Sequence, residues 1–141
     1  MVQIDGEICL CDSHGRPDFR ALMRVAHRKP ADEAELSFHA FDLLQINATD
    51  LKPKPLVERR KRLMGLVERL TETVPVLYLP DQFANGLELL TMCDKMHLEG
   101  IVSKRLDRPY VSGPTKDWLK VKCTAWKEAS RWRAEVFEKS T

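Results

Sequence analysis

The sequence has no long apolar run, no paired cysteines and no strong excess of charge of either sign. None of its 141 residues lies in an apolar stretch near the length of a membrane span, and residues 1–7 have neither the basic nor the apolar part of a secretory leader. We therefore expect no membrane contact and no leader. The net charge of +2 is too small to indicate nucleic acid by itself. An apolar content of 43% suffices for the core of one soluble globular domain.

Cysteine motifs for metal binding are also absent. The four cysteines, Cys9, Cys11, Cys93 and Cys123, form no C-x-x-C pair. Cys9 and Cys11, with His14 nearby, do not have the spacing of a zinc motif, and a second ligand pair is missing. We therefore predict reduced thiols packed in strands and a cytoplasmic protein.

The hydrophobic pattern predicts an α+β fold. Alternation predicts a strand over residues 4–11, with Asp5 and Glu7 as surface acids, a strong strand over 36–46, and an edge strand over 74–79. We expect helices over residues 18–28, 55–70 and 87–96. The apolar side chains expected to pack from these helices are Phe19, Leu22, Val25 and Ala26; Leu56, Leu63, Met64, Leu66, Val67 and Leu70; and Leu87 and Leu90, with Cys93 or Met96.

Three features of the middle of the chain are interpreted from the pattern alone. From the pattern alone, Phe41 is a core residue and His39 a half-exposed strand residue. The basic run of residues 59–62 is assigned to a solvated helix face in preference to a DNA contact.

Positive charge is concentrated in the last third of the chain. From Glu99 to Arg133 there are nine Lys and Arg residues against four Asp and Glu residues. Two short predicted strands lie there, joined by a turn-rich loop, and alternation places Trp118, Lys120 and Lys122 on one face of the second. The segment is either an edge hairpin kept soluble by lysines or a phosphate site.

The residues of this hairpin also carry a family resemblance. Glu99-Gly-Ile-Val-Ser-Lys104, the linker Arg108-Pro-Tyr-Val-Ser-Gly-Pro and Trp118-Leu-Lys-Val-Lys122 resemble, in order, the paired nucleotidyltransferase motifs of ATP-dependent DNA ligases. The likeness is strongest to the ligase domain of the bacterial non-homologous end-joining ligase. Upstream, Ile4-Asp-Gly-Glu-Ile8, Phe41-Asp42 and the passage from Asp50-Leu51 to Glu58-Arg59 resemble further motifs of the same family. The resemblance runs from about Ile4 to Cys123.

The resemblance implies a fold and a site. The fold is a partial nucleotidyltransferase (ATP-grasp-like) domain over residues 1–123, with antiparallel and mixed sheets, flanking helices and a C-terminal extension over 124–141. The implied nucleotide-binding residues are Glu7 at the ribose or metal, Phe41 stacked on adenine, Glu99 as a ligand of Mg²⁺ or Mn²⁺, and Lys120 and Lys122 at the α-phosphate of ATP. Lys104, Arg105 and Trp118 are implied phosphate or DNA contacts.

The family's nucleophile is missing from these residues. The family attacks ATP with the lysine of a K-x-D-G motif, but the only Asp-Gly here is Asp5-Gly6, and glutamine occupies position 3. Glutamine cannot form a lysyl-AMP. We therefore assign Asp5-Gly6-Glu7 to a later motif and expect a truncated domain, without a catalytic lysine or an oligonucleotide-binding domain, that cannot adenylate itself. Loss of the N-terminal strands would leave an open sheet edge, so we expect a marginal, association-prone fold or one completed by a second ligase chain.

Three functions follow from these expectations. The first is nucleotidyl transfer in a DNA ligase that seals nicked or broken duplex DNA during repair and recombination, in the cytoplasm at the nucleoid. The second is a catalytically inactive remnant that binds nucleotide or DNA. The third is an RNA ligase or capping-type nucleotidyltransferase, which the wording of residues 108–123 disfavours.

Overall fold

The computed structural model describes residues 1–11, 19–26, 35–70, 76–78, 83 and 85–128. The chain divides into two compact units, and each is discontinuous in sequence. The first contains Met1–Pro80 with Leu106–Val111, and the second contains Asp81–Arg105 with Ser112–Thr141. The sequence also predicts a turn at residues 12–17 and a loop at 31–35; the turn and residues 31–34 lie outside the described residues, whereas Glu35 begins a strand.

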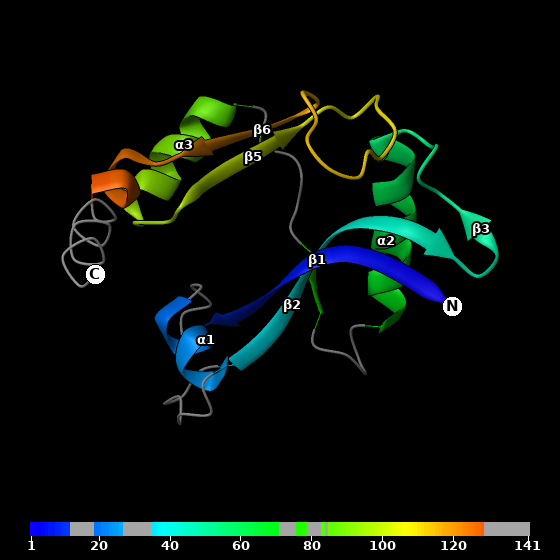
Figure 1. Cartoon of the computed structure of the whole chain (residues 1–141), viewed down its shortest axis with the longest axis horizontal. Helices are drawn as coiled ribbons and strands as arrows, with labels where there is room; N and C mark the ends of the chain where they lie inside the picture. Colours follow the sequence, from blue (N-terminus) through cyan, green and yellow to red (C-terminus); the bar gives the residue numbers. More distant parts are fainter. Residues whose placement is uncertain (12–18, 27–34, 71–75, 79–82, 84, 129–141) are drawn as a thin grey trace, which may run out of the picture. The chain divides into compact units, whose positions relative to one another are not determined.

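The first unit contains a mixed four-stranded sheet (Figure 1). Strand β1 (Val2–Cys11) pairs antiparallel with β2 (Glu35–Ile46) along its length. At the other edge of β2, the short strand β3 (Thr49–Asp50) is antiparallel and β4 (Val76–Tyr78) is parallel. The predicted fold class, α+β with antiparallel and mixed sheets, is confirmed.

Two bulges interrupt the pairing of β1 with β2. Asp5 is opposite Asp42 while Gly6 is opposite Ala40, so Phe41 is an extra residue in β2. The second register shift inserts Leu44 in the same way. Each extra residue reverses the alternation of faces. As a result, neighbouring residues of β2 are buried in succession, namely Ala40, Asp42, Leu43 and Leu44.

The strict alternation predicted for β2 is therefore wrong. The prediction for His39, in the regularly paired part of the strand, is also wrong. His39 is only 8% exposed, whereas the pattern predicted a half-exposed side chain. Its Nε2 lies 3.0 Å from Ser37 Oγ and 3.9 Å from Cys11 Sγ. These partners allow the polar imidazole ring to be buried.

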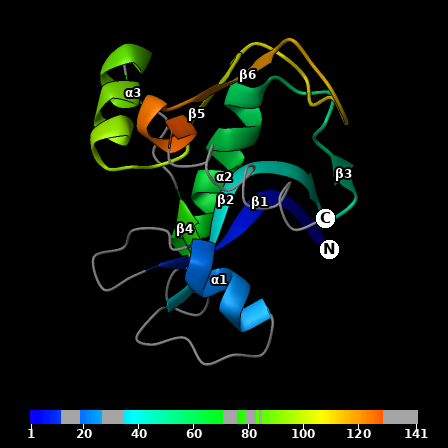
Figure 2. The same cartoon turned by 60° about the vertical axis from the view of Figure 1, so that its left-hand side comes forward.

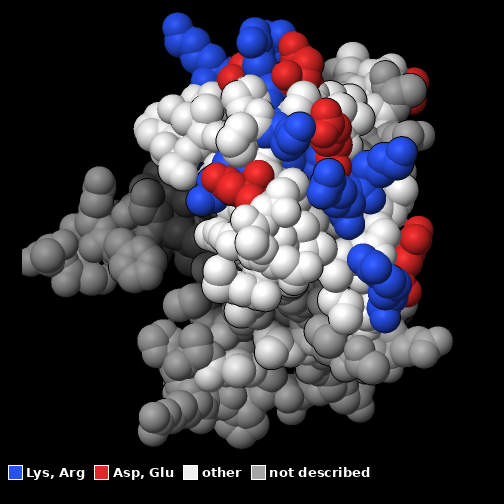
Figure 3. Space-filling view, turned by 90° about the vertical axis from the view of Figure 1, so that its right-hand side faces the viewer, with Lys and Arg blue, Asp and Glu red and all other residues white. Residues whose placement is uncertain are grey.

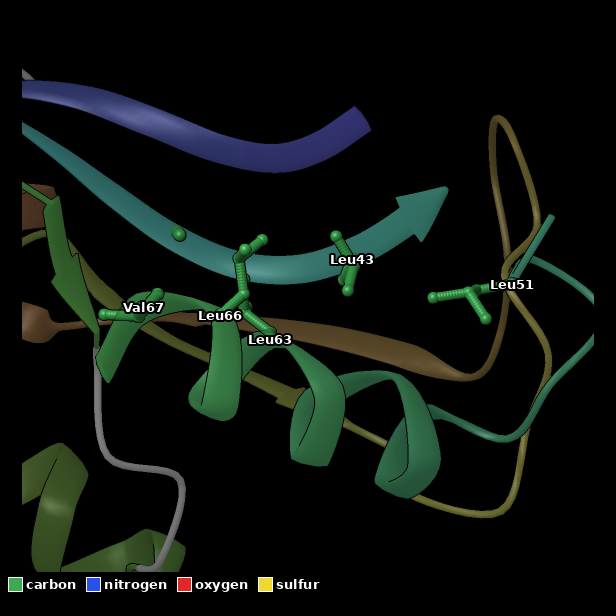
Figure 4. Packing of buried hydrophobic residues seen from close by; sticks show 6 residues of the cluster. Leu43, Leu51, Leu63, Leu66 and Val67 are labelled. Atoms are coloured by element: carbon green, nitrogen blue, oxygen red, sulfur yellow. The ribbon is translucent and has the colours of Figure 1, made fainter. Parts of the chain in front are cut away.

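Helix α2 (Leu56–Leu70) covers this sheet and supplies half of the buried residues of the main hydrophobic cluster. Figure 4 shows Leu63, Leu66 and Val67 of α2 directed at β2, where Leu43 contributes to the same cluster. Leu51, from the segment that follows β3, is fully buried in it. The predicted packing of α2 is confirmed except at Met64, which is 44% exposed.

Helix α1 (Phe19–Ala26) lies within the predicted helix and packs differently. Ala21 is its buried residue, with an exposure of 2%, and Leu22 is half-buried. Val25 was predicted to pack but is 42% exposed. The side chains of Phe19 and Ala26 lie outside the described residues.

The second unit consists of helix α3 (Gly86–Lys95) and a hairpin of β5 (Gly100–Lys104) and β6 (Trp118–Lys122), as Figures 1 and 2 show. The Asn85 side chain accepts hydrogen bonds from the amides of Leu87 and Glu88 and so starts the helix. Cys93 of α3 is buried as predicted, but Leu87 is 71% exposed. Met96, the predicted alternative to Cys93, lies just beyond the helix and is 50% exposed.

Within the described residues, no helix combines the length and the apolar character needed to cross a membrane.

Candidate functional site

The β5–β6 hairpin brings the predicted phosphate-binding residues onto one face. Lys122 is opposite Gly100, Lys120 opposite Val102, and Trp118 opposite Lys104. Residues that face each other across an antiparallel pair project to the same side of the sheet. The opposite side includes Cys123, which is buried with its Sγ 3.9 Å from the carbonyl oxygen of Leu90 in α3. Helix α3 therefore packs against the side that does not carry the lysines.

Gly100 allows Glu99 to reach the end of β6. Its φ of +154° is rarely adopted by residues with a side chain, and a Cβ atom there would collide with the carbonyl oxygen of Val121. The carbonyl oxygen of Glu99 accepts a hydrogen bond of 2.9 Å from the amide of Cys123. The backbone of Glu99 is thus held beside Lys122.

Glu99 and two lysines form a charged cluster. Lys120 Nζ lies 2.7 Å from Glu99 Oε1, and Lys122 Nζ lies 3.5 Å from the same oxygen. The hydrogen bond from Lys120, with a smaller effect of Lys122, lowers the pKa of Glu99 although partial burial opposes this shift. Two ammonium groups share one carboxylate, so the cluster keeps a net positive charge. Because the side chains are 41–54% exposed, an anion in solution can reach them.

Tryptophan rings flank this cluster. Lys104 Nζ lies 3.9 Å from the centre of the Trp118 ring, and Lys122 Nζ lies 4.3 Å from that of Trp126. Arg105 lies beyond the strand, with its Nε 4.0 Å from Asp117 Oδ1. The structure therefore places Lys104 and Trp118 on the face of Lys120 and Lys122, and pairs Arg105 with an acid. Figure 3 likewise shows basic side chains lying next to acidic ones.

The other two predicted nucleotide-binding residues, Glu7 and Phe41, belong to the first unit. Glu7 is exposed on β1, opposite His39. Phe41 is half-buried and lies at the bulge of β2. The core role that the pattern alone assigned to Phe41 is thus only partly met.

The sequence analysis missed a buried ion pair next to Phe41. Arg59 donates from Nε to Asp42 Oδ1 at 2.8 Å and from Nη2 to Asp42 Oδ2 at 2.6 Å. Arg59 is 1% exposed and Asp42 is fully buried. Such a bidentate geometry is the strongest form of an arginine–carboxylate contact.

Arg59 also joins several segments of its unit. Its Nη1 donates to the carbonyl oxygens of Lys54 at 2.6 Å and Arg108 at 3.2 Å, and its guanidinium carbon lies 5.8 Å from the centre of the Tyr110 ring. The Tyr110 hydroxyl donates to Asp5 Oδ2 at 3.5 Å. Burial raises the pKa of Tyr110, and the charges of Asp5 and Asp42 raise it further.

The predicted solvated face of residues 59–62 is therefore wrong at two of its four positions. Arg59 and Arg60 are 1% and 9% exposed, whereas Lys61 and Arg62 are exposed as predicted. A signal was available, because Arg59 follows Leu56 by three residues and precedes Leu63 by four. That spacing places it on the apolar stripe of the helix.

Metal ligands are sparse in the described part of the chain. It contains no group of three or more His, Cys, Asp and Glu residues able to hold a metal ion. Glu99 could serve as the single protein ligand of a Mg²⁺ or Mn²⁺ ion whose remaining ligands are water and substrate phosphates, which is how Mg²⁺ commonly binds. A surface depression of about 530 Å³ lies elsewhere, lined by Ile46, Arg62, Gly65, Glu68 and Arg69, and includes none of the predicted residues.

Comparison with known proteins identifies the family. Residues 1–122 match the family described as "ATP dependent DNA ligase domain". A Pseudomonas aeruginosa protein, "Multifunctional non-homologous end joining protein LigD", is 35% identical over 120 residues, which are 85% of this chain and 14% of that protein. The "SPbeta prophage-derived DNA ligase-like protein LigB" of Bacillus subtilis is 32% identical over 120 residues, which are 84% of this chain and 43% of that protein.

Solved structures agree with this assignment. The crystal structure of the ligase domain of LigD from M. tuberculosis matches with a TM-score of 0.64 and 27% identity, covering 86% of this chain and 37% of that one. A mycobacterial DNA ligase D complexed with ATP and MES also matches with a TM-score of 0.64, at 28% identity, covering 86% of this chain and 38% of that one.

The chain belongs to the family of ATP-dependent DNA ligase domains. Its similarity to LigD proteins confirms the predicted likeness to the end-joining ligase. It spans less than half the length of each of these relatives.

Proposed function

We propose that the β5–β6 hairpin binds the α-phosphate of ATP in a DNA ligase reaction. The observation that carries this proposal is the cluster of Lys120 and Lys122 within 3.5 Å of the Glu99 carboxylate, on the strand face that α3 does not cover. Two ammonium groups on one strand face suit the two non-bridging oxygens of a phosphate. The match of residues 1–122 to the ligase domain family supports the same role.

The chemistry of adenylyl transfer explains what these groups would do. The reaction is an in-line displacement at the α-phosphate, so its rate depends on positioning and on neutralising negative charge. Lys120 and Lys122 would hold the non-bridging oxygens and stabilise the charge that grows on them. Glu99 would keep both ammonium groups in place and would be one ligand of Mg²⁺ or Mn²⁺. When bound, that ion supplies further charge neutralisation at the phosphates.

We propose a separate role for Phe41 in the first unit, the stacking of adenine. Its ring is half-buried and lies at a bulge, a feature that often redirects a side chain next to a functional site. A flat aromatic side chain suits the flat face of adenine. Glu7, exposed on β1, is proposed to contact the ribose or the metal.

We infer that these 141 residues alone do not form a lysyl-AMP. They contain no K-x-D-G motif, and Gln3 stands where that lysine would precede Asp5-Gly6. The proposed substrate is nicked or broken duplex DNA, in strand-break repair, with the attacking lysine supplied outside these residues or by a second ligase chain. Lys104 and Trp118, which lie on the lysine face, and Arg105 just beyond β5 are proposed contacts to phosphate or DNA.

Intact-mass spectrometry after incubation with ATP and Mg²⁺ tests the inference about the nucleophile. We expect no mass increase from AMP. A covalent AMP adduct would contradict the inference, and peptide mapping would then locate the modified lysine.

ATP-dependent thermal stabilisation tests the phosphate site. We expect ATP to raise the melting temperature of the wild type and of Lys116→Ala, an exposed control in the same unit, but not that of Lys120→Ala. Without any ATP effect in the wild type, the proposed phosphate site would be wrong. Stabilisation without an adduct favours the second candidate function, a remnant that binds nucleotide but does not react.

A further inference from the structure

Two successive arginines of α2 contact two successive residues of the β2 bulge. Arg60 Nη1 donates to the carbonyl oxygen of Phe41 at 3.2 Å. Arg59 binds both carboxylate oxygens of Asp42, at 2.8 and 2.6 Å. One helix therefore supplies a charged donor to the backbone of Phe41 and another to the side chain of Asp42.

The bulge needs such support because it lies outside the regular pairing of the sheet. Phe41 is the extra residue of β2 between two opposed pairs, so the ladder of β1 does not fix its backbone as it fixes its neighbours. Burial strengthens the hydrogen bonds from Arg59 and Arg60, because Asp42 is fully buried and Arg60 is only 9% exposed. The backbone of Phe41 thus receives a hydrogen bond from α2 at the bulge.

Arg59 is itself held in place. Its Nη1 donates to the carbonyl oxygens of Lys54 and Arg108, at 2.6 and 3.2 Å. Its Nε and Nη2 are occupied by Asp42. The guanidinium group is thus bound on both of its edges. Because Arg59 is fixed, the Asp42 carboxylate that it binds is fixed as well.

We propose that Arg60, supported by the Arg59–Asp42 pair, is a positioning residue that sets the Phe41 ring for contact with an adenine base. This rests on the proposed function, which assigns adenine stacking to Phe41. Arg60 does not touch the base itself. It acts on base binding only through the Phe41 backbone, and it has no part in binding phosphate.

The test uses two ligands that separate the base from the phosphates. Binding of adenosine, and separately of inorganic triphosphate, is measured by NMR titration of the full chain and its variants. Arg60→Met removes the contact, Arg60→Lys keeps a cationic donor, and Phe41→Leu removes the ring. Arg62→Met is the matched control, since Arg62 is an exposed arginine on the same helix.

We expect Arg60→Met to bind adenosine about tenfold more weakly, the size of one charge-assisted hydrogen bond. Phe41→Leu should bind adenosine about tenfold more weakly as well, because it loses the aromatic stack. Their affinity for triphosphate should stay within about twofold of the wild type. Arg60→Lys should recover part of the adenosine affinity, and Arg62→Met should bind both ligands normally. Wild-type adenosine affinity in Arg60→Met, or an equal loss of both ligands, would overturn the proposal.

Hydrogen exchange without ligand distinguishes this proposal from the proposed function. If Phe41→Leu binds adenosine as the wild type does, the stacking role of Phe41 is wrong. The exchange of the Phe41 and Asp42 amides then decides on Arg60. We expect faster exchange at these amides in Arg60→Met, with the Ser37 amide of the same strand unchanged. Equal exchange in Arg60→Met and Arg62→Met would overturn the positioning role.

Discussion

Arg59 occupies a position on α2 where the pattern of neighbouring leucines calls for an apolar side chain. Its burial is tolerated because every nitrogen of its guanidinium group donates a hydrogen bond within the unit. Removing one partner of such a pair leaves an uncompensated buried charge, which costs far more than the intact pair contributes.

We predict that Arg59→Met lowers the free energy of unfolding by about 3–5 kcal/mol, because Asp42 is left charged and buried. Arg62→Met, on the exposed face, should change it by less than about 0.5 kcal/mol. Urea unfolding followed by circular dichroism measures both. The double variant Asp42→Leu with Arg59→Met should recover much of the lost stability. Equal stabilities of Arg59→Met and Arg62→Met would contradict this account.

Lys120 should control the titration of Glu99. The Lys120 hydrogen bond lowers the pKa of this carboxyl group, so Lys120→Ala should move it up toward its ordinary value. A lowered folded-state pKa stabilises the fold above the unfolded-state pKa, and this contribution is lost as the pH falls through the folded-state value. NMR titration of the Glu99 carboxyl carbon measures the shift, with Lys116→Ala as control. An unchanged titration in Lys120→Ala would argue against the pair.

The hairpin depends on a single glycine for its geometry. In Gly100→Ala the new Cβ would meet the carbonyl oxygen of Val121, and the φ of +154° would be strained, so we expect a cost of about 1–3 kcal/mol. Gly86→Ala is the control, since a Cβ there meets nothing within 4 Å. Cross-strand NOEs between β5 and β6 should weaken in the first variant only. Intact NOEs in Gly100→Ala would refute the steric argument.

Elements were more predictable from the sequence than their buried faces. Alternation and helical periodicity placed β1, β2, α2, α3 and the hairpin, since these signals are local. The bulges of β2 were not predictable, because an extra residue leaves no mark on composition and shows only in the pairing with β1. Leu87 was assigned to the buried face, which is wrong, because the apolar pattern of one short helix does not show which side packs against the rest of the unit.

The candidate site was predictable in part. Glu99, Lys120 and Lys122 were predicted to lie in one site, and in the structure both lysines form ion pairs with Glu99. The Arg59–Asp42 pair was missed because a buried arginine looks like a surface residue until its carboxylate partner is known. The roles of the predicted site residues toward ATP, metal and DNA stay predictions.

At the scale of the whole molecule, the buried apolar residues are unevenly divided. Of those that the structure describes, only Cys93 and Cys123 belong to the second unit. We therefore predict that α3, β5 and β6 open more readily than β2 and α2. Hydrogen exchange read by mass spectrometry should show lower protection in peptides from the second unit. Equal protection in both units would contradict this ranking.

We also predict association through the edge of the sheet. Among the described residues, β1 pairs with β2 alone, and Ile8 on β1 is 54% exposed. Such an edge favours pairing between chains. Sedimentation should show mass increasing with concentration, and Ile8→Lys should suppress the increase. A stable monomer at all concentrations would show that the edge is protected.

The start of α2 has a consequence for the order of events during synthesis. Its first two amides, at Leu56 and Val57, donate to the carbonyl oxygens of Arg108 and Leu106, at 2.9 and 3.0 Å. At about 5–20 residues per second, a ribosome that has made Leu56 needs about 3–10 s more to make Arg108. During that interval the helix start and one edge of the Arg59 guanidinium group lack these acceptors. The first unit therefore completes its fold only after the first segment of the second unit, Asp81–Arg105, has been translated.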